Sequence, residues 1–140
     1  MRYRLILLAL AMTATVWAQA TLTIEVSGVR SDDGMVMMSL LSGEDSFKNG
    51  QGEAFFQAHA AIENGRVVFV IEDVPPGVYA IRVMHDENGN GKMDTNWIGI
   101  PKEGYGASNN PKPRMGPPRW KDCHFEVTGD DLALGITMRY

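Results

Sequence analysis

A chain of 140 residues has room for one domain of ordinary size. Its formal net charge of −4 argues against a nucleic acid partner, because contacts to phosphates rely on lysine and arginine. The single cysteine, Cys123, excludes an intrachain disulfide. The fold must therefore be held by packing, with a metal ion as the one further stabiliser to consider.

The N-terminal segment has the composition of a secretory signal peptide. Arg2 and Arg4 precede an apolar run, Leu5 to Met12, and small residues follow in the pattern Ala-Gln-Ala at 18–20. The run is shorter than the roughly 20 apolar residues of a membrane-spanning helix. We therefore expect residues 1–20 to be a signal peptide cleaved after Ala18 or Ala20. Residues 21–140 would then form one periplasmic or secreted domain without a transmembrane segment.

Charge is unevenly distributed along this expected mature chain. Without Arg2 and Arg4, 11 basic residues remain against 17 acidic ones, a net charge of −6. The segment from Ile98 to Lys121 contains five lysines and arginines but one acidic residue, so it carries +4 and the remainder −10. A basic segment in an acidic domain is a candidate contact surface.

The first half of the mature chain reads as strands. Residues 21–27 alternate, with Leu22, Ile24 and Val26 on one face, which predicts a half-buried strand. Residues 35–42, MVMMSLLS, are apolar enough for a strand covered on both faces. Residues 43–53 are polar and glycine-rich and predict a loop with at most one helical turn.

Two turn motifs organise the middle of the chain. Asn64-Gly65 lies between two apolar runs and supplies the positive φ angles of a two-residue hairpin turn. Further on, the Pro-Pro-Gly turn at 75–77 precedes an alternating strand that begins near Tyr79. This spacing resembles a tyrosine corner, in which the tyrosine hydroxyl bonds to upstream backbone.

After Asp94 the regular pattern stops until Phe125, and the chain closes with an alternating strand over 132–140. Roughly seven short strands with frequent turns predict an all-β, Greek-key sandwich, immunoglobulin-like or transthyretin-like. Residues 95–121 would form one long irregular loop. Its aromatic residues, Trp97, Tyr105 and Trp120, predict that it packs back on the sandwich, because disordered segments are poor in aromatics.

The start of this loop, HDENGNGKMD at 85–94, matches most of a calcium loop. The oxygen ligands at positions 1, 3, 5, 7 and 9 would come from Asp86, Asn88, Asn90, the Lys92 carbonyl and Asp94, with Gly91 at the sharp turn. Trp97 occupies position 12, where an EF-hand has a bidentate glutamate, so this is not an EF-hand. Calcium binding, in the weak range of roughly 10⁻⁴ to 10⁻³ M, and a bare asparagine-glycine turn both remain open.

Acid–base catalysis and copper binding are two alternative chemistries for this sequence. His85, Asp86, Glu87 and Asp94 offer groups for acid–base catalysis, as in a small hydrolase, but the sequence supplies no pocket to shift their pKa values and no catalytic motif. Copper is the third alternative, because methionine, histidine and cysteine suit it. However, His124 directly follows Cys123 and the next methionine is Met138, which does not fit a blue-copper site. We expect no enzyme activity.

The basic loop combines cations with aromatic faces, as sites for sugars or anionic polymers often do. A loop that merely caps the sandwich is the equally weighted alternative. The candidate contact residues are Trp97, Tyr105, Asn109, Asn110, Arg114, Arg119 and Trp120.

The chain from Thr21 to Tyr140 resembles an exported bacterial family known as domain of unknown function 2141, most clearly over the stretch from Asp73 to Asn110. The resemblance is most specific in Pro-Pro-Gly-x-Tyr, in His-Asp-Glu-Asn-Gly-Asn-Gly-Lys-x-Asp and in Gly-Ile-Pro-Lys-Glu-Gly-Tyr-Gly-x-Ser-Asn-Asn. It implies an exported β-sandwich similar to transthyretin-like or carboxypeptidase-regulatory-like modules, and it implies no catalytic residues. We therefore expect a binding or structural module of the cell envelope, with an envelope protein or a glycan as its partner and calcium as the one candidate cofactor.

Overall fold

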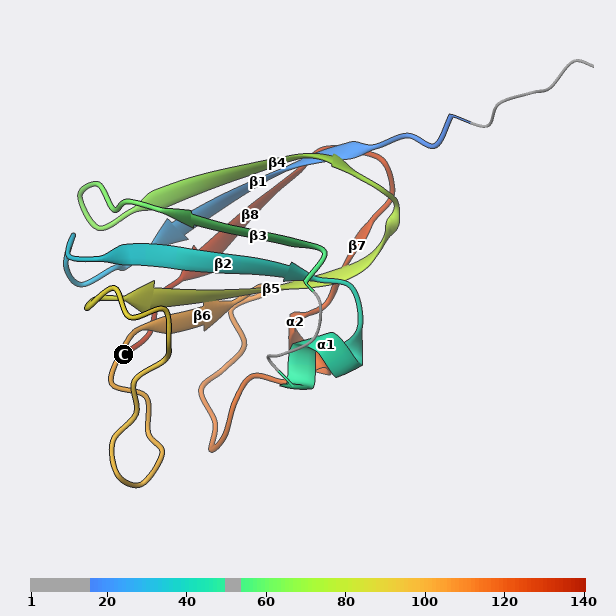
Figure 1. The fold of residues 1–140 in the computed structure, drawn as a ribbon. Coiled ribbons are helices and arrows are strands. Elements are labelled where there is room, and N and C mark those ends of the chain that lie inside the picture. Colours follow the sequence, from blue (N-terminus) through green and yellow to red (C-terminus); the bar gives the residue numbers. More distant parts are fainter. Residues whose placement is uncertain (1–15, 50–53) are drawn as a thin grey trace, which may run out of the picture.

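The computed structural model describes residues 16–49 and 54–140, which form a sandwich of two β-sheets (Figure 1). The apolar run of the expected signal peptide lies outside the described residues. The smaller sheet has the order β4-β1-β8 and the larger has the order β3-β2-β5-β6, with β7 paired to the start of β5. The strands are β1 (Ala20–Ser27), β2 (Met35–Leu41), β3 (Phe56–Ala60), β4 (Val67–Val74), β5 (Gly77–Asp86), β6 (Tyr105–Ala107), β7 (Phe125–Val127) and β8 (Leu132–Thr137). The predicted all-β sandwich is confirmed, whereas its Greek-key connectivity stays a prediction.

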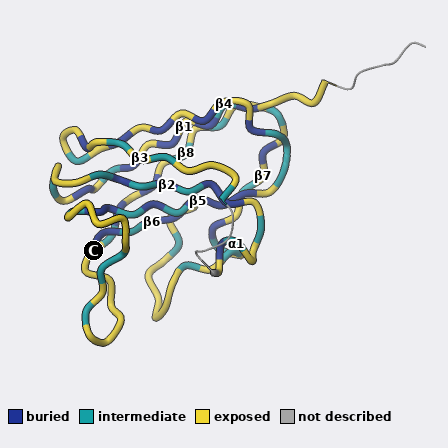
Figure 2. The backbone as a smooth tube through the Cα atoms, in the orientation of Figure 1, coloured by how far each residue is buried: buried dark blue, intermediate teal, exposed yellow. Residues whose placement is uncertain are grey.

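The main core lies between the two sheets and follows the alternation seen in the sequence. Leu22, Ile24 and Val26 of β1 are completely buried, as are Val36 and Leu40 of β2. Because successive side chains of a strand point to opposite faces, β1 contributes every second residue to this core, and β2 does so at Val36, Met38 and Leu40. Figure 2 shows the resulting alternation of buried and exposed positions along the strands.

Two short helices cover part of the outer face of the larger sheet. They are α1 (Glu44–Asn49), within the segment predicted as a loop with at most one helical turn, and α2 (Trp120–Cys123). Phe47 of α1 and Cys123 of α2 are buried in a second apolar cluster with Leu41, Ala80 and Ala107. Trp120 packs its ring edge-on against Phe47, with centroids 5.9 Å apart. Within the described residues, neither helix is long or apolar enough to cross a membrane.

The Asn-Gly turn forms as predicted, but the hairpin around it is minimal. Asn64 and Gly65 have φ angles of 52° and 72°, and Glu63 and Arg66 exchange backbone hydrogen bonds of 3.0 and 3.1 Å. Beyond this one pair the chain separates, because β3 belongs to the larger sheet and β4 to the smaller. The turn therefore joins the two layers, and the two apolar runs that flank it do not continue as one hairpin.

The tyrosine corner is confirmed. The Tyr79 hydroxyl donates a 2.8 Å hydrogen bond to the Pro75 carbonyl, and the side chain is 4% exposed. Gly77 lies directly against this ring, where a Cβ atom would meet Tyr79 Cε2 at 3.2 Å. The Pro-Pro-Gly turn is thus fixed at the point where β5 begins.

The region 95–121 is not one irregular loop, and that expectation is corrected. It contains β6, which pairs with β5 through Arg82, Val83 and Met84, and it ends in the first residues of α2. Tyr105 also pairs with Arg139 through two backbone hydrogen bonds of 2.9 and 2.8 Å. This pairing joins the larger sheet to the end of β8 and divides the region into two loops.

Candidate functional site

The loop that leaves β5 is closed by its own hydrogen bonds. Asp86, 1% exposed, accepts the Asn90 N–H at Oδ1 (3.1 Å) and the Gly91 N–H at Oδ2 (2.8 Å). Gly91 has a φ of 73°, the left-handed conformation that the sixth position of a calcium loop requires. Gly34 lies so close to this loop that a Cβ there would be 1.9 Å from the Asp86 carbonyl oxygen. The loop therefore starts from a fixed point on the sandwich.

Amide side chains of this loop converge on Asp94. The Asn88 Nδ2 atom lies 2.5 Å from Asp94 Oδ2, and the Asn90 Nδ2 atom lies 3.0 and 3.1 Å from the two carboxylate oxygens. The oxygens of the same two amides accept backbone N–H groups, Asn88 Oδ1 from Asn90 at 3.1 Å and Asn90 Oδ1 from Lys92 at 2.9 Å. The side chains of Asn88, Asn90 and Asp94 thus lie together, held by hydrogen bonds.

Glu103 fixes both ends of the loop, a role that the sequence did not indicate. Its side chain is buried, 4% exposed, and its carboxylate accepts the Glu87 N–H at 3.0 Å and the Asp94 N–H at 3.1 Å.

Trp97, at the position of the EF-hand glutamate, is 94% exposed. Asp86 and Asp94 are the acidic members of the predicted set. In the part of the chain that the structure describes, no three His, Cys, Asp or Glu side chains group as metal ligands.

His85 is completely buried beside this loop, in a network that joins distant segments. Its Nε2 atom lies 2.7 Å from the Asp33 carbonyl, and its Nδ1 atom lies 2.7 Å from the Tyr140 hydroxyl. Since a carbonyl only accepts, Nε2 carries the hydrogen and Nδ1 can accept from the tyrosine. The hydroxyl oxygen in turn accepts the Arg30 N–H at 3.0 Å.

An ion pair covers the His85 network from outside. Arg30 donates to both oxygens of Glu87, at 2.6 and 2.8 Å, and its guanidinium lies 4.3 Å from the centre of the Tyr140 ring. The hydrogen bond from Arg30 lowers the pKa of the Glu87 carboxyl below its usual range.

The side-chain polar atoms of His85 and Asp86 are all hydrogen-bonded and buried. This arrangement does not favour the hydrolase alternative.

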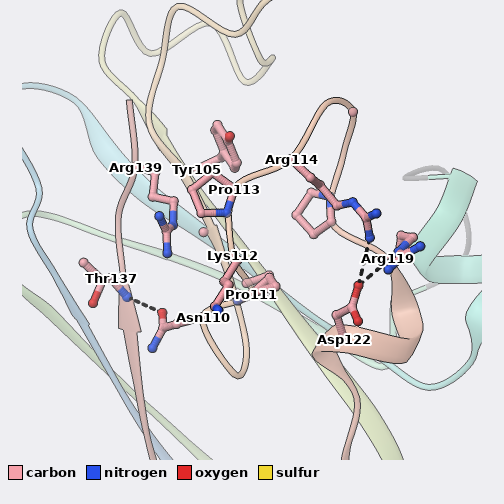
Figure 3. A pocket seen from close by; sticks show the side chains of 14 residues that line it. Tyr105, Asn110, Pro111, Lys112, Pro113, Arg114, Arg119, Asp122, Thr137 and Arg139 are labelled. Atoms are coloured by element: carbon pink, nitrogen blue, oxygen red, sulfur yellow. Dashed lines mark hydrogen bonds and ion pairs between the residues drawn. The ribbon is translucent and has the colours of Figure 1, made fainter.

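A basic pocket opens between the end of β8, β6 and the loop before α2 (Figure 3). It is a shallow recess that is partly open to solvent. The Tyr105 side chain and three prolines, Pro111, Pro113 and Pro118, give it apolar surfaces. None of His85, Asp86 and Asp94 lines it. Its charged lining residues are Lys112, Arg114, Arg119, Asp122 and Arg139.

Charges in the pocket are only partly neutralised. Arg119 and Arg114 both contact Asp122 Oδ2, at 3.0 and 3.5 Å, and the Arg119 hydrogen bond lowers the pKa of the Asp122 carboxyl. Within residues 16–49 and 54–140, neither Lys112 nor Arg139 forms an ion pair. Four cations against one carboxylate leave the pocket positive on an acidic chain. Arg139 was not singled out from the sequence, because it lies in the closing strand pattern and far from the basic segment.

Apart from Asn109, the predicted contact residues separate into three groups. Tyr105, Asn110, Arg114 and Arg119 line the basic pocket. Trp97 lies on the other loop and is almost fully exposed, so the expectation that it packs back on the sandwich is wrong. Trp120 is half-buried against Phe47 and stacks on His124.

Both asparagines of this set hold backbone in place. Asn109 donates to the His124 carbonyl at 2.9 Å. Asn110 donates to the Gly135 carbonyl at 2.9 Å and accepts the Thr137 N–H at 2.8 Å, as a neighbouring strand would. Their positive φ angles of 65° and 44° turn the chain sharply after β6. The pocket rim is thereby fixed to the edge of β8.

The residues considered for copper do not converge on one point. Cys123 is buried in the cluster under the helices, His124 is exposed, and Met138 belongs to the main core. Met38 is also in that core, 1% exposed. Burial raises the pKa of the Cys123 thiol to about 11, so the thiolate that binds soft metals is disfavoured.

The fold and its pocket together define a small all-β sandwich with a charged recess at one edge. Residues 24–134 match the family model described as "Uncharacterized protein conserved in bacteria", domain of unknown function 2141. Because the match covers most of the chain, this protein belongs to that family. No curated protein and no solved structure matches the chain.

Proposed function

We propose that this protein is an exported binding module of the cell envelope and that the basic pocket takes an anionic saccharide. The observation that carries the proposal is the charge of the pocket, four cations and one carboxylate on a chain with a net charge of −4. Lys112 and Arg139 are available to pair with carboxylates or phosphates of a ligand. The Tyr105 ring and the prolines supply apolar surfaces on which sugar rings can pack.

The rim of the pocket supports binding because it is fixed before a ligand arrives. Asn110 bonds to β8 on one side, while Arg119 and Asp122 pair at the start of α2 on the other. A preorganised site loses less conformational entropy on binding than a mobile loop. The same arrangement also keeps two arginines beside the opening.

The proposal is tested by calorimetric titration with a short oligogalacturonate, with an uncharged malto-oligosaccharide of equal length as the comparison. We expect binding of the anionic probe alone, with an affinity that falls as sodium chloride is added. Lys112→Gln and Arg139→Gln should each weaken binding about tenfold, the effect of one charged hydrogen bond.

One further variant sharpens the test. Lys48→Gln serves as the matched control, since Lys48 is an exposed cation of α1 that lies outside the pocket. Equal binding of charged and uncharged probes, or affinity unchanged by Lys112→Gln and Arg139→Gln, would refute the anionic saccharide.

We further propose that calcium, bound by Asp86, Asn88, Asn90, the Lys92 carbonyl and Asp94, fixes the loop after β5. The convergence of two amides on Asp94 favours this role over catalysis. At a calcium concentration about ten times Kd, the folded state should gain about 1.4 kcal/mol. Thermal unfolding should then show a Tm several degrees higher in millimolar calcium, and a chelator should reverse the rise.

Asp94→Asn is the variant for this test, with Asp130→Asn on an exposed turn as its control. The readout is the calcium-dependent change in Tm within each variant, so any general loss of stability is subtracted. We expect the change to vanish in Asp94→Asn alone. A Tm of the unaltered protein that does not respond to calcium would mean that the loop is an asparagine-glycine turn without a bound ion.

Export rests on the sequence of the first twenty residues, and mass spectrometry of the protein recovered outside the cytoplasm tests it. We expect a mature chain that starts at Gln19 or Thr21. Recovery of the uncleaved chain would contradict the signal peptide. Ala20 is completely buried and pairs with Val74, which supports cleavage after Ala18.

A further inference from the structure

A second surface feature lies on the loop from Asp94 to Lys102, here called the tip loop. Three of its large apolar side chains face solvent: Trp97 is 94% exposed, Ile98 56% and Ile100 53%. Figure 2 shows this loop extending beyond the sheets as a mostly exposed segment. Scattered exposed apolar residues are normal, but three within four positions mark an interaction surface.

The tip loop holds these side chains outward with a closed set of hydrogen bonds. The Asn96 side chain accepts the N–H groups of Ile98 (3.0 Å) and Ile100 (2.9 Å), and the Asn96 carbonyl accepts the Gly99 N–H (3.0 Å). The Asn96 N–H donates to the Ile100 carbonyl at 2.8 Å, and Lys102 N–H donates to Asp94 at 2.8 Å. Backbone groups paired in this way can enter an apolar environment without being left unsatisfied.

A second loop, residues 110–119, projects from the sandwich on the same side as the tip loop (Figure 1). Its Met115 is fully exposed. Lys102 and Lys112 are exposed near the bases of the two loops, and Arg114 neighbours Met115. Arg114 pairs with Asp122 at 3.5 Å, whereas Lys102 and Lys112 form no ion pair within the described residues.

We propose that this face docks on an anionic lipid bilayer, with Trp97, Ile98 and Ile100 in the headgroup region and the lysines and arginine against the phosphates. Tryptophan prefers the membrane–water interface, and apolar residues flanked by cations characterise proteins that lie on membranes. The positive charge selects an anionic surface over a neutral one. The inference goes beyond the saccharide pocket, because none of the three apolar side chains lines that pocket.

The experiment measures co-sedimentation of the full chain with vesicles of phosphatidylglycerol and phosphatidylethanolamine, compared with vesicles of phosphatidylcholine alone. We expect binding to the anionic vesicles and a blue shift of tryptophan emission that Trp97→Ala abolishes. Trp97→Ala combined with Ile98→Ala should reduce partitioning at least tenfold. Lys102→Gln should reduce it roughly fivefold, the effect of one cation near a charged surface.

Val68→Ala combined with Val70→Ala is the matched control, because these residues of β4 are similarly exposed, 57% and 55%, but lie away from the tip loop. The control should bind vesicles like the unaltered protein. No binding to anionic vesicles, equal binding to neutral ones, or binding unchanged by the tip-loop variants would overturn the proposal. Trp97→Ala should leave oligogalacturonate binding intact, so failure here and failure of the pocket are distinguishable.

Discussion

The Cys123 thiol lies in the apolar cluster between the larger sheet and the two helices, with no exposed surface. Burial, assisted by the neighbouring Asp122 carboxylate and opposed by Arg82, raises the pKa of the thiol from 9.0 to about 11. The reactive species is the thiolate, so the folded protein should protect this cysteine.

We therefore expect iodoacetamide at pH 8 to label Cys123 only after denaturant unfolds the chain, as followed by mass spectrometry. The raised pKa also sets a pH dependence, because the unfolded thiol ionises first. This contribution to stability is fully present below pH 9 and is lost as the pH rises to about 11. Fast labelling of the folded protein would show that the cluster opens readily.

At the scale of elements, β6 is the strand that sequence patterns miss. It has three residues, and Gly106 at its centre leaves no side-chain alternation to detect. The glycine is required by packing: a Cβ there would lie 2.9 Å from Ile136 Cγ2 and 3.0 Å from Val83 Cγ2. The close approach of the two sheets at this edge therefore depends on Gly106.

Gly106→Ala should lower the free energy of unfolding by about 1–3 kcal/mol, the usual cost of overpacking. Urea titration of the variant measures it. Gly135→Ala is the matched control, because a Cβ at Gly135 meets nothing within 4 Å. An unchanged stability of Gly106→Ala would mean that β6 and β8 can separate at little cost.

Other elements were predicted well where the signal is local. The alternation of Leu22, Ile24 and Val26 and the turn at Asn64-Gly65 depend on neighbouring residues, and both are confirmed. Glu103 and Arg139 were missed, because each acts on groups distant in sequence. The predicted calcium-loop residues lie together as expected. They fall within nine consecutive positions, so this grouping too could be predicted from local spacing.

At the scale of the whole molecule, the first and last strands pair with each other. β1 and β8 pair in parallel from Leu22–Leu132 to Ser27–Thr137, and the Tyr140 hydroxyl reaches His85 and the Arg30 N–H. Burial raises the pKa of the Tyr140 phenol, so it remains a hydrogen-bond donor across the physiological range.

Tyr140→Phe should lower the free energy of unfolding by about 1–3 kcal/mol, because it leaves the buried Nδ1 atom of His85 without a donor. Chemical denaturation measures this loss. Tyr105→Phe is the control, since within the described residues its hydroxyl makes no hydrogen bond. A loss of similar size in both variants would assign the effect to general changes at this edge.

The sequence alone predicts most of the strands, although not β6, together with the turns and the grouping of Asp86, Asn88, Asn90 and Asp94. These features rest on alternation, positive φ angles and short spacings, which act between near neighbours. Tertiary packing separates β3 and β4 into different sheets, places Glu103 where it closes the loop, and brings Arg139 and Lys112 into the same basic pocket. These contacts depend on the path of the chain between distant residues. That path is set by how the layers pack together, and no local pattern records it.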